Sequence, residues 1–154
     1  FYNDSKKFLY RKPDDMVDLS SGVICCPNNF FFDNNSSEGM IRTTHIANFD
    51  LWDNPSSNDY RAKKILWQKK SLEKICTITP DFRSSIVFTD MFTPKTIKRF
   101  TGHLNGAVYG SPRKIKNGIT PVENLFICGT DQGFMGIIGA MLSGISMANL
   151  HAMN

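Results

Sequence analysis

Short apolar runs separated by polar turns fill the first third of the chain, a pattern typical of β-strands. A strand is predicted over Lys7 to Lys12, and the turn at Pro13 to Asp15 predicts that it folds back onto Met16 to Leu19. The continuous apolar run from Val23 to Cys26 predicts a strand buried on both faces. With a further strand predicted over Met40 to Phe49, this region is expected to form part of a β-sheet.

A helical period replaces this pattern in the middle of the chain. Apolar side chains recur close to one stripe from Asp59 to about Ile75, which predicts an amphipathic helix. The same segment carries many lysines and arginines. We interpret these cations as a solvated helix face, in preference to a membrane-surface or nucleic-acid contact.

A strand and a short helix are predicted next. The strand covers Ile86 to Phe88. Thr93 followed by proline is typical of a helix start, so a helix is expected from Pro94 to about Phe100, closed by Gly102. Residues 103–123 are punctuated by glycines and are interpreted as a loop or hairpin.

The stretch from Glu123 to Asn149 is the most informative part of the chain. It predicts a short strand over Leu125 to Cys128, a tight turn at residues 129–131, and a long helix of small and apolar residues. This order places backbone N–H groups and a helix N-terminus beside a ligand. A buried Asp131 would suit a hydroxyl donor such as a ribityl chain. Three further glycines would let a ligand approach the backbone closely: Gly133, Gly136 and Gly139.

Two other interpretations of this helix stay open. Residues 132–150 contain no charged side chain, which also fits a transmembrane helix, although Gly and Ser are frequent there. A plain buried helix of an α/β core fits as well, because periodicity does not distinguish a core helix from one that faces a ligand. The glycine pattern is not G-x-G-x-x-G, so it is not a first nucleotide-binding turn.

Composition narrows the class of protein. The 154 residues, 41% apolar and 21% charged, suit one folded domain and exclude a disordered tail. A formal net charge of +4 without a focused basic face gives no support to nucleic-acid binding. No metal site is expected, because His45, His103 and His151 are far apart and no C-x-x-C occurs.

The sequence also gives an expectation for the cellular compartment and for whether the chain is part of a longer protein. No signal peptide is visible, and the cysteine pattern indicates a reducing compartment, so a cytoplasmic protein is expected. The chain opens on Phe1 without an initiating Met, which indicates a piece of something longer.

The segment ENLFICGTDQGFMGIIGAMLSGISMAN, residues 123–149, resembles the C-terminal flavin-binding segment of the phytoene desaturase family. That family also includes carotenoid isomerases and retinol saturases, and belongs to the amine oxidase superfamily. The resemblance continues through FTDMFTPKTIKRFTGHLNGAVYGSP, residues 88–112, and more loosely through residues 21–30 and 42–52.

The resemblance implies the C-terminal part of a two-domain FAD/NAD(P)-binding flavoprotein fold, which is α/β in class and α+β as an isolated fragment. Residues 1–102 would belong to the substrate-binding domain with its mixed sheet. Residues 103–154 would supply the returning strand, turn and helix of the FAD-binding domain. The N-terminal β-α-β unit with its G-x-G-x-x-G is absent, so the site for the ADP half of FAD would lie outside this chain.

The resemblance also implies which residues hold FAD. Gly129 and Asp131, with Thr130 between them, match the Gly-Asp signature that contacts the ribityl–pyrophosphate part of the cofactor. The helix start that points at the flavin pyrimidine edge is matched by Gly136, Ile137, Ile138, Gly139 and Ala140. Residues 106–110 match a loop that the family places close to the flavin.

The expected function is oxidoreduction of a lipophilic polyene or isoprenoid, as in carotenoid biosynthesis, by hydride transfer to or from flavin. Such transfer needs little acid–base help, so no catalytic residue is assigned. Asp90 and Arg99 are interpreted as structural or capping residues, while His103 and Tyr109 are left open between a cavity lining and a structural role.

The alternatives are an amine-oxidase-type flavoenzyme and a non-catalytic membrane-surface or interaction module. Peripheral membrane contact is left open as a further partner. Desaturation, saturation and isomerisation are not distinguished by these residues.

Overall fold

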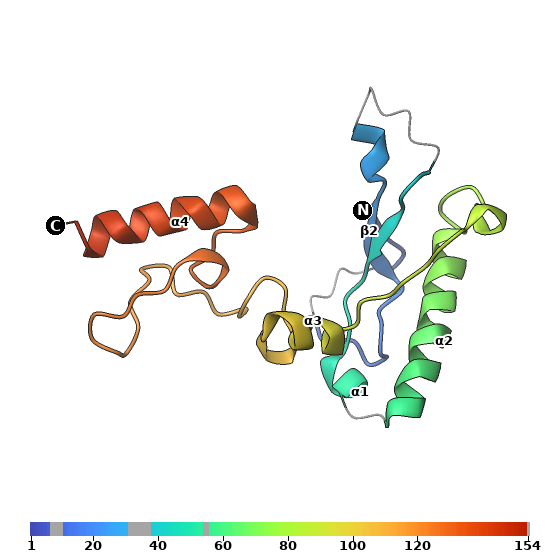
Figure 1. The fold of residues 1–154 in the computed structure, drawn as a ribbon, viewed down its shortest axis with the longest axis horizontal. Coiled ribbons are helices and arrows are strands. Elements are labelled where there is room, and N and C mark those ends of the chain that lie inside the picture. Colours follow the sequence, from blue (N-terminus) through green and yellow to red (C-terminus); the bar gives the residue numbers. More distant parts are fainter. Residues whose placement is uncertain (7–10, 31–37, 54–55, 154) are drawn as a thin grey trace.

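A small antiparallel sheet and α-helices build the chain (Figure 1). The structure, a computed structural model, describes residues 1–6, 11–30, 38–53 and 56–153. The helices within these residues are α1 (Phe49–Asp53), α2 (Ser57–Ile75), α3 (Pro94–Thr101) and α4 (Gly136–His151). The strands are β1 (Tyr2–Asn3), β2 (Ser21–Cys25) and β3 (Arg42–Thr44), in the sheet order β1-β2-β3. Short 3-10 turns are η1 (Pro27–Phe30), η2 (Arg83–Ser85), η3 (Leu104–Gly106) and η4 (Gly129–Asp131). The described chain is therefore mixed α/β.

The sheet corrects the prediction in burial and in strand length. β2 forms in the predicted apolar run, but it pairs antiparallel with both neighbours and its residues are only half-buried. The prediction of burial on both faces is wrong, because an apolar run does not reveal whether a second layer covers the other face. β3 is much shorter than the predicted strand over residues 40–49, since Phe49 already begins α1. The predicted strand over residues 7–12 lies mostly outside the described residues.

Two tryptophans organise the core of the N-terminal half. Trp52 of α1 and Trp67 of α2 pack with Met16 and Val17, and all four are buried. The Trp52 indole Nε1 donates to the Met16 carbonyl at 2.9 Å, which satisfies its polar atom inside the core. This cluster therefore joins the two helices to the chain segment that leads into the sheet.

Helices α2 and α3 form where the sequence predicts them, although α2 begins at Ser57, two residues before the expected start. At the start of α2, the Ser56 hydroxyl accepts a hydrogen bond from the Asp59 N–H. At the start of α3, Thr93 and Thr96 form a reciprocal capping box. Gly102 ends α3 with φ of +70°, a left-handed conformation that costs glycine little. Both helices are confirmed because their boundaries are encoded locally.

Two predicted strands do not form among the described residues. Ile86 to Phe88 stays outside the sheet, with Val87 88% and Phe88 81% exposed. Leu125 to Cys128 contributes only an isolated bridge between Phe126 and Ile119. Both predictions are wrong for this chain, because an apolar segment becomes a strand only beside a neighbour that completes its hydrogen bonds.

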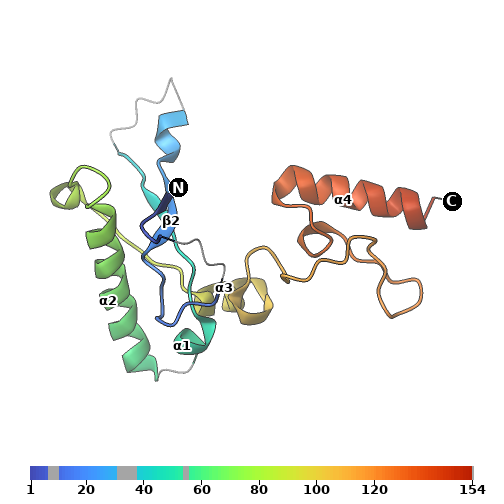
Figure 2. The same cartoon turned by 180° about the vertical axis from the view of Figure 1, so that it is seen from behind.

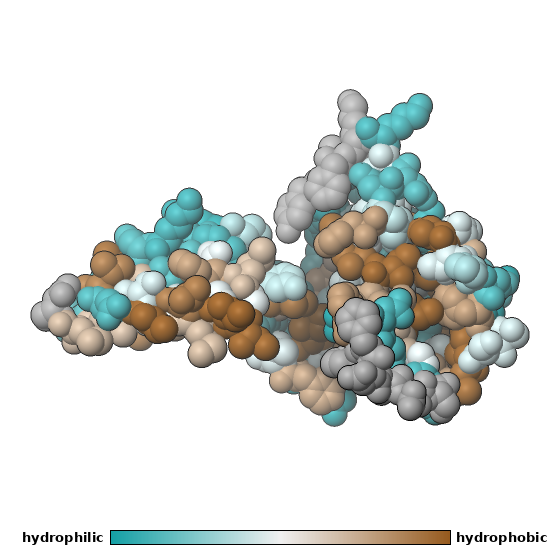
Figure 3. Space-filling view, turned by 90° about the horizontal axis from the view of Figure 1, so that it is seen from above, coloured by the Kyte–Doolittle hydropathy of each residue, from teal (hydrophilic) through white to brown (hydrophobic). Residues whose placement is uncertain are grey.

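The chain is drawn out into two lobes (Figures 1 and 2). The N-terminal lobe, residues 1–106, ends in η3, which packs against α1 and α3. The C-terminal lobe, residues 107–153, is built around α4 and η4, which pack against each other. Hydrophobic surface is visible on the C-terminal lobe in the space-filling view (Figure 3). The assignment of residues 1–102 and 103–154 to two different domains stays a prediction.

His45 closes the end of the sheet beside β1. Its Nδ1 lies 3.3 Å from the Ser21 carbonyl oxygen and 3.3 Å from the Tyr2 hydroxyl. Its Nε2 is buried and has no hydrogen-bond partner among the described residues. Gly22 lies against the same ring, so that an added Cβ would come within 2.7 Å of Nδ1. Burial lowers the pKa of His45 below its ordinary value of 6.5, partly opposed by the Ser21 carbonyl and Asp18.

We expect the stability of the chain to fall as the pH drops below about 6.5. The unfolded chain takes up the His45 proton more readily than the folded one, so protons favour unfolding until the pH falls below the folded-state pKa. Melting temperatures measured between about pH 8 and about pH 5 test this. His45→Gln should flatten the dependence, whereas His103→Gln, on an exposed histidine, should leave it as in the parent. Equal pH dependence in the parent and His45→Gln would contradict the assignment.

Candidate functional site

The predicted glycine turn is present as η4, between Cys128 and Gln132. Gly129 enters the turn with φ of +83°, and an added Cβ would meet nothing within 4 Å. The backbone of the turn is therefore open on one side at this residue. Thr130 and Asp131 are half-buried, so the fully buried aspartate that the sequence suggested is not present in this chain.

Asp131 ties the turn to a segment twenty residues earlier in the chain. Its Oδ1 accepts a hydrogen bond from the Ser111 N–H at 2.7 Å. Gly110 lies against the same carboxylate with φ of +72°, and a Cβ at this position would overlap the carboxylate oxygens. The Ile115 N–H donates to the Asp131 carbonyl at 2.9 Å. Two segments that the resemblance places at the cofactor, 106–110 and 129–131, thus meet at Asp131.

A second, buried network fixes the turn to α4. The Ser143 hydroxyl accepts from the Gly129 N–H at 2.6 Å and donates to the Gln132 side-chain carbonyl. The Gln132 amide in turn donates to the Lys116 carbonyl at 2.9 Å. Ser143 and Gln132 are both buried, so every one of these bonds replaces a lost contact with water.

Sequence reasoning missed the role of Ser143. The available signal was one hydroxyl at a position of α4 that lies two helical turns after Gly136, inside an otherwise apolar stretch. A serine in a helix interior more often bonds a carbonyl of its own helix, as Ser146 does with Leu142. Only the folded chain shows that Ser143 reaches the turn instead.

The start of α4 is open. Met135 occupies the N-cap position and makes no side-chain cap, so the first N–H groups of the helix have no capping side chain. Ile137 and Ile138 are 83% and 75% exposed. Gly139 and Ala140 are half-buried, and an added Cβ on Gly139 would lie 3.2 Å from the Phe134 carbonyl carbon. The structure therefore places residues 136–138 at a free helix N-terminus and turns residue 139 toward its own lobe.

Most of α4 is uncovered by this chain. Of its side chains, all of which are described, only Ser143 and Met147 are buried. Its exposed apolar residues lie on several sides of the helix: Ile137, Ile138, Met141, Leu142, Ile145 and Leu150. A helix that is apolar all round is normally buried in a larger core or in a membrane. No helix among the described residues is both long and apolar enough to cross a bilayer.

The charged candidates Asp90, Arg99 and His103 have their contacts outside the turn, whereas Tyr109 directly precedes Gly110, which lies against Asp131. Asp90 accepts a hydrogen bond from Lys64 of α2 at 2.8 Å, and this bond together with the Met91 N–H holds the Asp90 pKa below its ordinary range. His103 Nδ1 lies 2.8 Å from the Ala107 carbonyl, which makes it part of the connection between the lobes. Arg99 lies over the Phe100 ring. These contacts support the structural interpretation of Asp90 and give none of these side chains a reacting partner.

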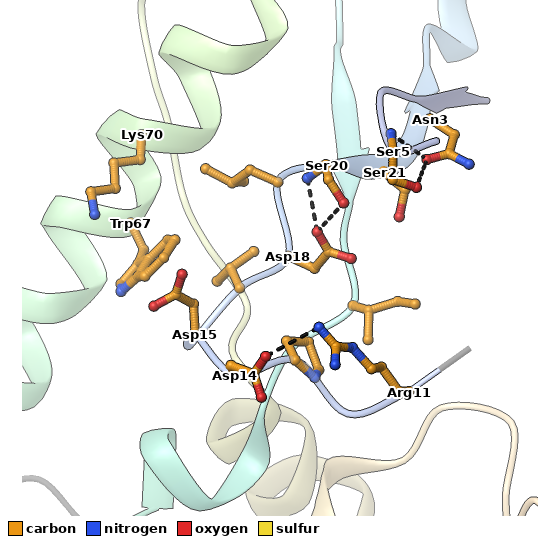
Figure 4. A pocket seen from close by; sticks show the side chains of 14 residues that line it. Asn3, Ser5, Arg11, Asp14, Asp15, Asp18, Ser20, Ser21, Trp67 and Lys70 are labelled. Atoms are coloured by element: carbon orange, nitrogen blue, oxygen red, sulfur yellow. Dashed lines mark hydrogen bonds and ion pairs between the residues drawn. The ribbon is translucent and has the colours of Figure 1, made fainter. Parts of the chain in front are cut away.

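A separate hollow of about 510 Å³ lies on the N-terminal lobe (Figure 4). Trp67 and three carboxylates line it, but two of these already serve local contacts. Asp18 accepts from the Ser20 N–H at 2.8 Å, and Asp14 pairs with Arg11 at 3.2 Å. No group of three potential metal ligands occurs among the described residues. This hollow therefore offers no chemistry comparable to that of the η4 turn.

The donor set around η4 fits part of a flavin cofactor. An added Cβ at Gly129 or Gly136 would meet nothing within 4 Å, so a ligand can approach both residues closely, although the Gly129 N–H is already bonded to Ser143. The uncapped α4 start supplies free N–H groups and the positive end of a helix dipole. Asp131 still has its second carboxylate oxygen, for which no hydrogen bond is present in the described part of the chain. A hydroxyl-bearing chain and an anionic ring edge match these groups in charge and polarity.

No protein-family model matches the chain, and no solved structure matches it. The all-trans-retinol 13,14-reductase of Danio rerio is 26% identical over 104 residues, covering 61% of this chain and 17% of that protein. Prolycopene isomerases 1 and 2, chloroplastic, of an Oncidium hybrid cultivar are each 28% identical over 119 residues, covering 71% of this chain and 20% of theirs. The chain thus spans a fifth or less of the length of these curated relatives. The similarities support a relationship with carotenoid and retinoid oxidoreductase-like proteins.

Proposed function

We propose that the chain is the C-terminal portion of an FAD-dependent oxidoreductase that acts on a polyene or other isoprenoid lipid. Residues 1–102 would belong to its substrate-binding domain and residues 103–154 to its FAD-binding domain. The names of the similar proteins, a retinol reductase and prolycopene isomerases, support the substrate class. The reaction proposed is hydride transfer to or from flavin.

The observation that carries the proposal is the meeting of two distant segments at Asp131. The turn Gly129–Asp131 and the loop that ends at Gly110 are two of the three parts of the sequence expected at the cofactor, the third being residues 136–140. They are joined here by the Asp131 carboxylate and the Ser111 N–H. An ordinary core turn would not require a carboxylate at this position, since a neutral acceptor would bond the same N–H.

Each part of the site has a role in this proposal. The free oxygen of Asp131 would accept a hydrogen bond from a hydroxyl of the ribityl chain. The N–H groups of Ile137, Ile138 and Gly139, with the helix dipole behind them, would face negative charge on the pyrimidine edge. Bound flavin would supply the capacity to accept or release a hydride. The chain itself would bind and orient the cofactor and would exclude water from it.

The uncovered surface of α4 supports the placement of the chain within a longer protein. Exposing Ile137, Ile138 and Met141 to water would cost about 25 cal/mol for each Å² of apolar surface, so a covering layer is favoured. We propose that the nucleotide-binding unit of the same protein provides that layer.

A second candidate, a membrane-surface module, has support from the N-terminal lobe. Val87, Phe88, Phe92 and Phe100 are strongly exposed, and Phe100 adjoins Arg99 on α3. Peripheral membrane contact is compatible with an enzyme that takes a lipid substrate. Flavin bound to the purified complete protein would support the enzyme. A complete protein without flavin would support the membrane-surface module instead.

We expect Asp131→Asn to weaken FAD binding about tenfold or more in the complete protein, because a charge-assisted hydrogen bond to a hydroxyl becomes a neutral one. The amide oxygen of Asn can still accept from the Ser111 N–H, so the melting temperature without cofactor should stay near that of the parent. Asp131→Ala removes the bond to the ribityl hydroxyl and the bond to the Ser111 N–H, so it should lower both the FAD affinity and the melting temperature. Dissociation constants for FAD and melting curves test this. Unchanged FAD affinity in Asp131→Asn would leave the carboxylate with a structural role only.

We also expect the reading frame that contains this chain to encode a G-x-G-x-x-G directly after a strand, upstream of Phe1. The η4 turn and α4 provide for only one half of a dinucleotide, and the other half needs such a unit. Sequencing the complete transcript tests this. A start codon immediately before Phe1, with no such motif upstream, would contradict the proposed function.

A further inference from the structure

An open hollow of about 600 Å³ lies on the C-terminal lobe beside the η4 turn. Its lining is aliphatic over one part, where Ile115, Ile119 and Ile127 contribute. Ser111, Arg113 and Asp131 contribute its polar part. The hollow therefore combines a cation, a carboxylate and a hydroxyl with an apolar surface.

Three hydrogen bonds fix the loop that carries Arg113. The Ser111 N–H donates to Asp131 Oδ1 at 2.7 Å, and the Arg113 N–H donates to the Ser111 hydroxyl at 3.1 Å. The Ile115 N–H donates to the Asp131 carbonyl at 2.9 Å. Because the backbone is held on both sides of residue 113, the guanidinium is presented from a defined point and not from a free loop.

The charge of Arg113 is not compensated within the described part of the chain. Arg113 is exposed and takes part in none of the ion pairs found there. Its neighbour Lys114 is already engaged, because the Lys114 ammonium donates to the Tyr109 carbonyl at 2.6 Å. Arg113 is therefore the cation of this hollow that is available to an anionic ligand.

The two charges of the hollow select different groups of one ligand. The Asp131 carboxylate repels an anion but accepts hydrogen bonds from hydroxyls. The Arg113 guanidinium, with a planar fork of donors, matches a phosphate. A ligand that carries hydroxyls next to a phosphate satisfies both, whereas a bare lipid chain or a neutral sugar satisfies at most one.

We propose that Arg113 binds the phosphate next to the ribityl chain of the flavin cofactor, while Asp131 binds the ribityl hydroxyls. This inference rests on the proposed function and adds to it a residue that selects phosphorylated flavins. Arg113 acts by binding and takes no part in the reaction.

The test compares flavins that differ in phosphate content. Dissociation constants for riboflavin, FMN and FAD are measured by calorimetry on the complete protein freed of cofactor. The variants are Arg113→Gln, the charge-conserving Arg113→Lys, and the matched control Arg99→Gln, which removes an exposed arginine of α3 outside the hollow. Melting curves of each variant show that the fold is retained.

We expect Arg113→Gln to weaken FMN and FAD binding about tenfold and to leave riboflavin binding unchanged. Arg113→Lys should recover part of this loss, and Arg99→Gln should match the parent. Raising the ionic strength from about 0.01 M to about 0.15 M should reduce the parent's preference for FMN over riboflavin more than that of Arg113→Gln. Inorganic phosphate should compete with FMN in the parent more strongly than in Arg113→Gln.

Other outcomes separate the inference from the proposed function. If all variants bind FMN and riboflavin in the parent's ratio, Arg113 is not a phosphate ligand, although the flavin function stands. Equal losses of riboflavin and FMN in Arg113→Gln would show a general structural role and overturn the inference. If the parent binds no flavin at all, the proposed function fails and the inference fails with it.

Discussion

The C-terminal lobe depends on two buried side chains of a single helix. The Ser143 hydroxyl accepts from the Gly129 N–H and donates to the Gln132 side-chain carbonyl, and Met147 packs closely against Gly118. Both lie on one face of α4, so the turn before the helix and the loop 111–118 are attached to the same side of it. Removing the Ser143 hydroxyl would leave polar groups buried without partners, at a cost of about 1–3 kcal/mol. The position of Asp131 follows from this attachment.

The exposed faces of α4 contribute little to the stability of this chain. A helix with so many exposed apolar side chains contributes little hydrophobic stabilisation to the chain that carries it, because burial and not sequence provides that energy. The N-terminal lobe has the reverse arrangement, since Trp52 and Trp67 are buried against Met16 and Val17. One lobe thus contains its own core, and the other offers a surface that a further layer can cover.

The two lobes also differ in how their charged side chains are paired. All the ion pairs of the described residues lie in the N-terminal lobe, and some join distant segments of it, such as Lys64 with Asp90 and Lys98 with Asp53. Exposed pairs of this kind contribute only a few tenths to about 1 kcal/mol each. On the C-terminal lobe, Arg113 is left without a carboxylate partner in the described chain while Asp131 is committed to the backbone of Ser111. That asymmetry gives the hollow its polarity.

The sequence by itself determined the features that depend on neighbouring residues: the start of α3 after Thr93, its end at Gly102, and the glycine turn before a long apolar helix. It did not determine which apolar runs would pair, and so the predicted strands at residues 86–88 and 125–128 are absent, while β2 is half-buried. Only the tertiary structure decided that Ser143 reaches Gly129 and that Asp131 reaches Ser111. Caps and turns are short-range interactions encoded within a few residues, whereas strand pairing, burial and these bonds need partners that only the folded chain brings together.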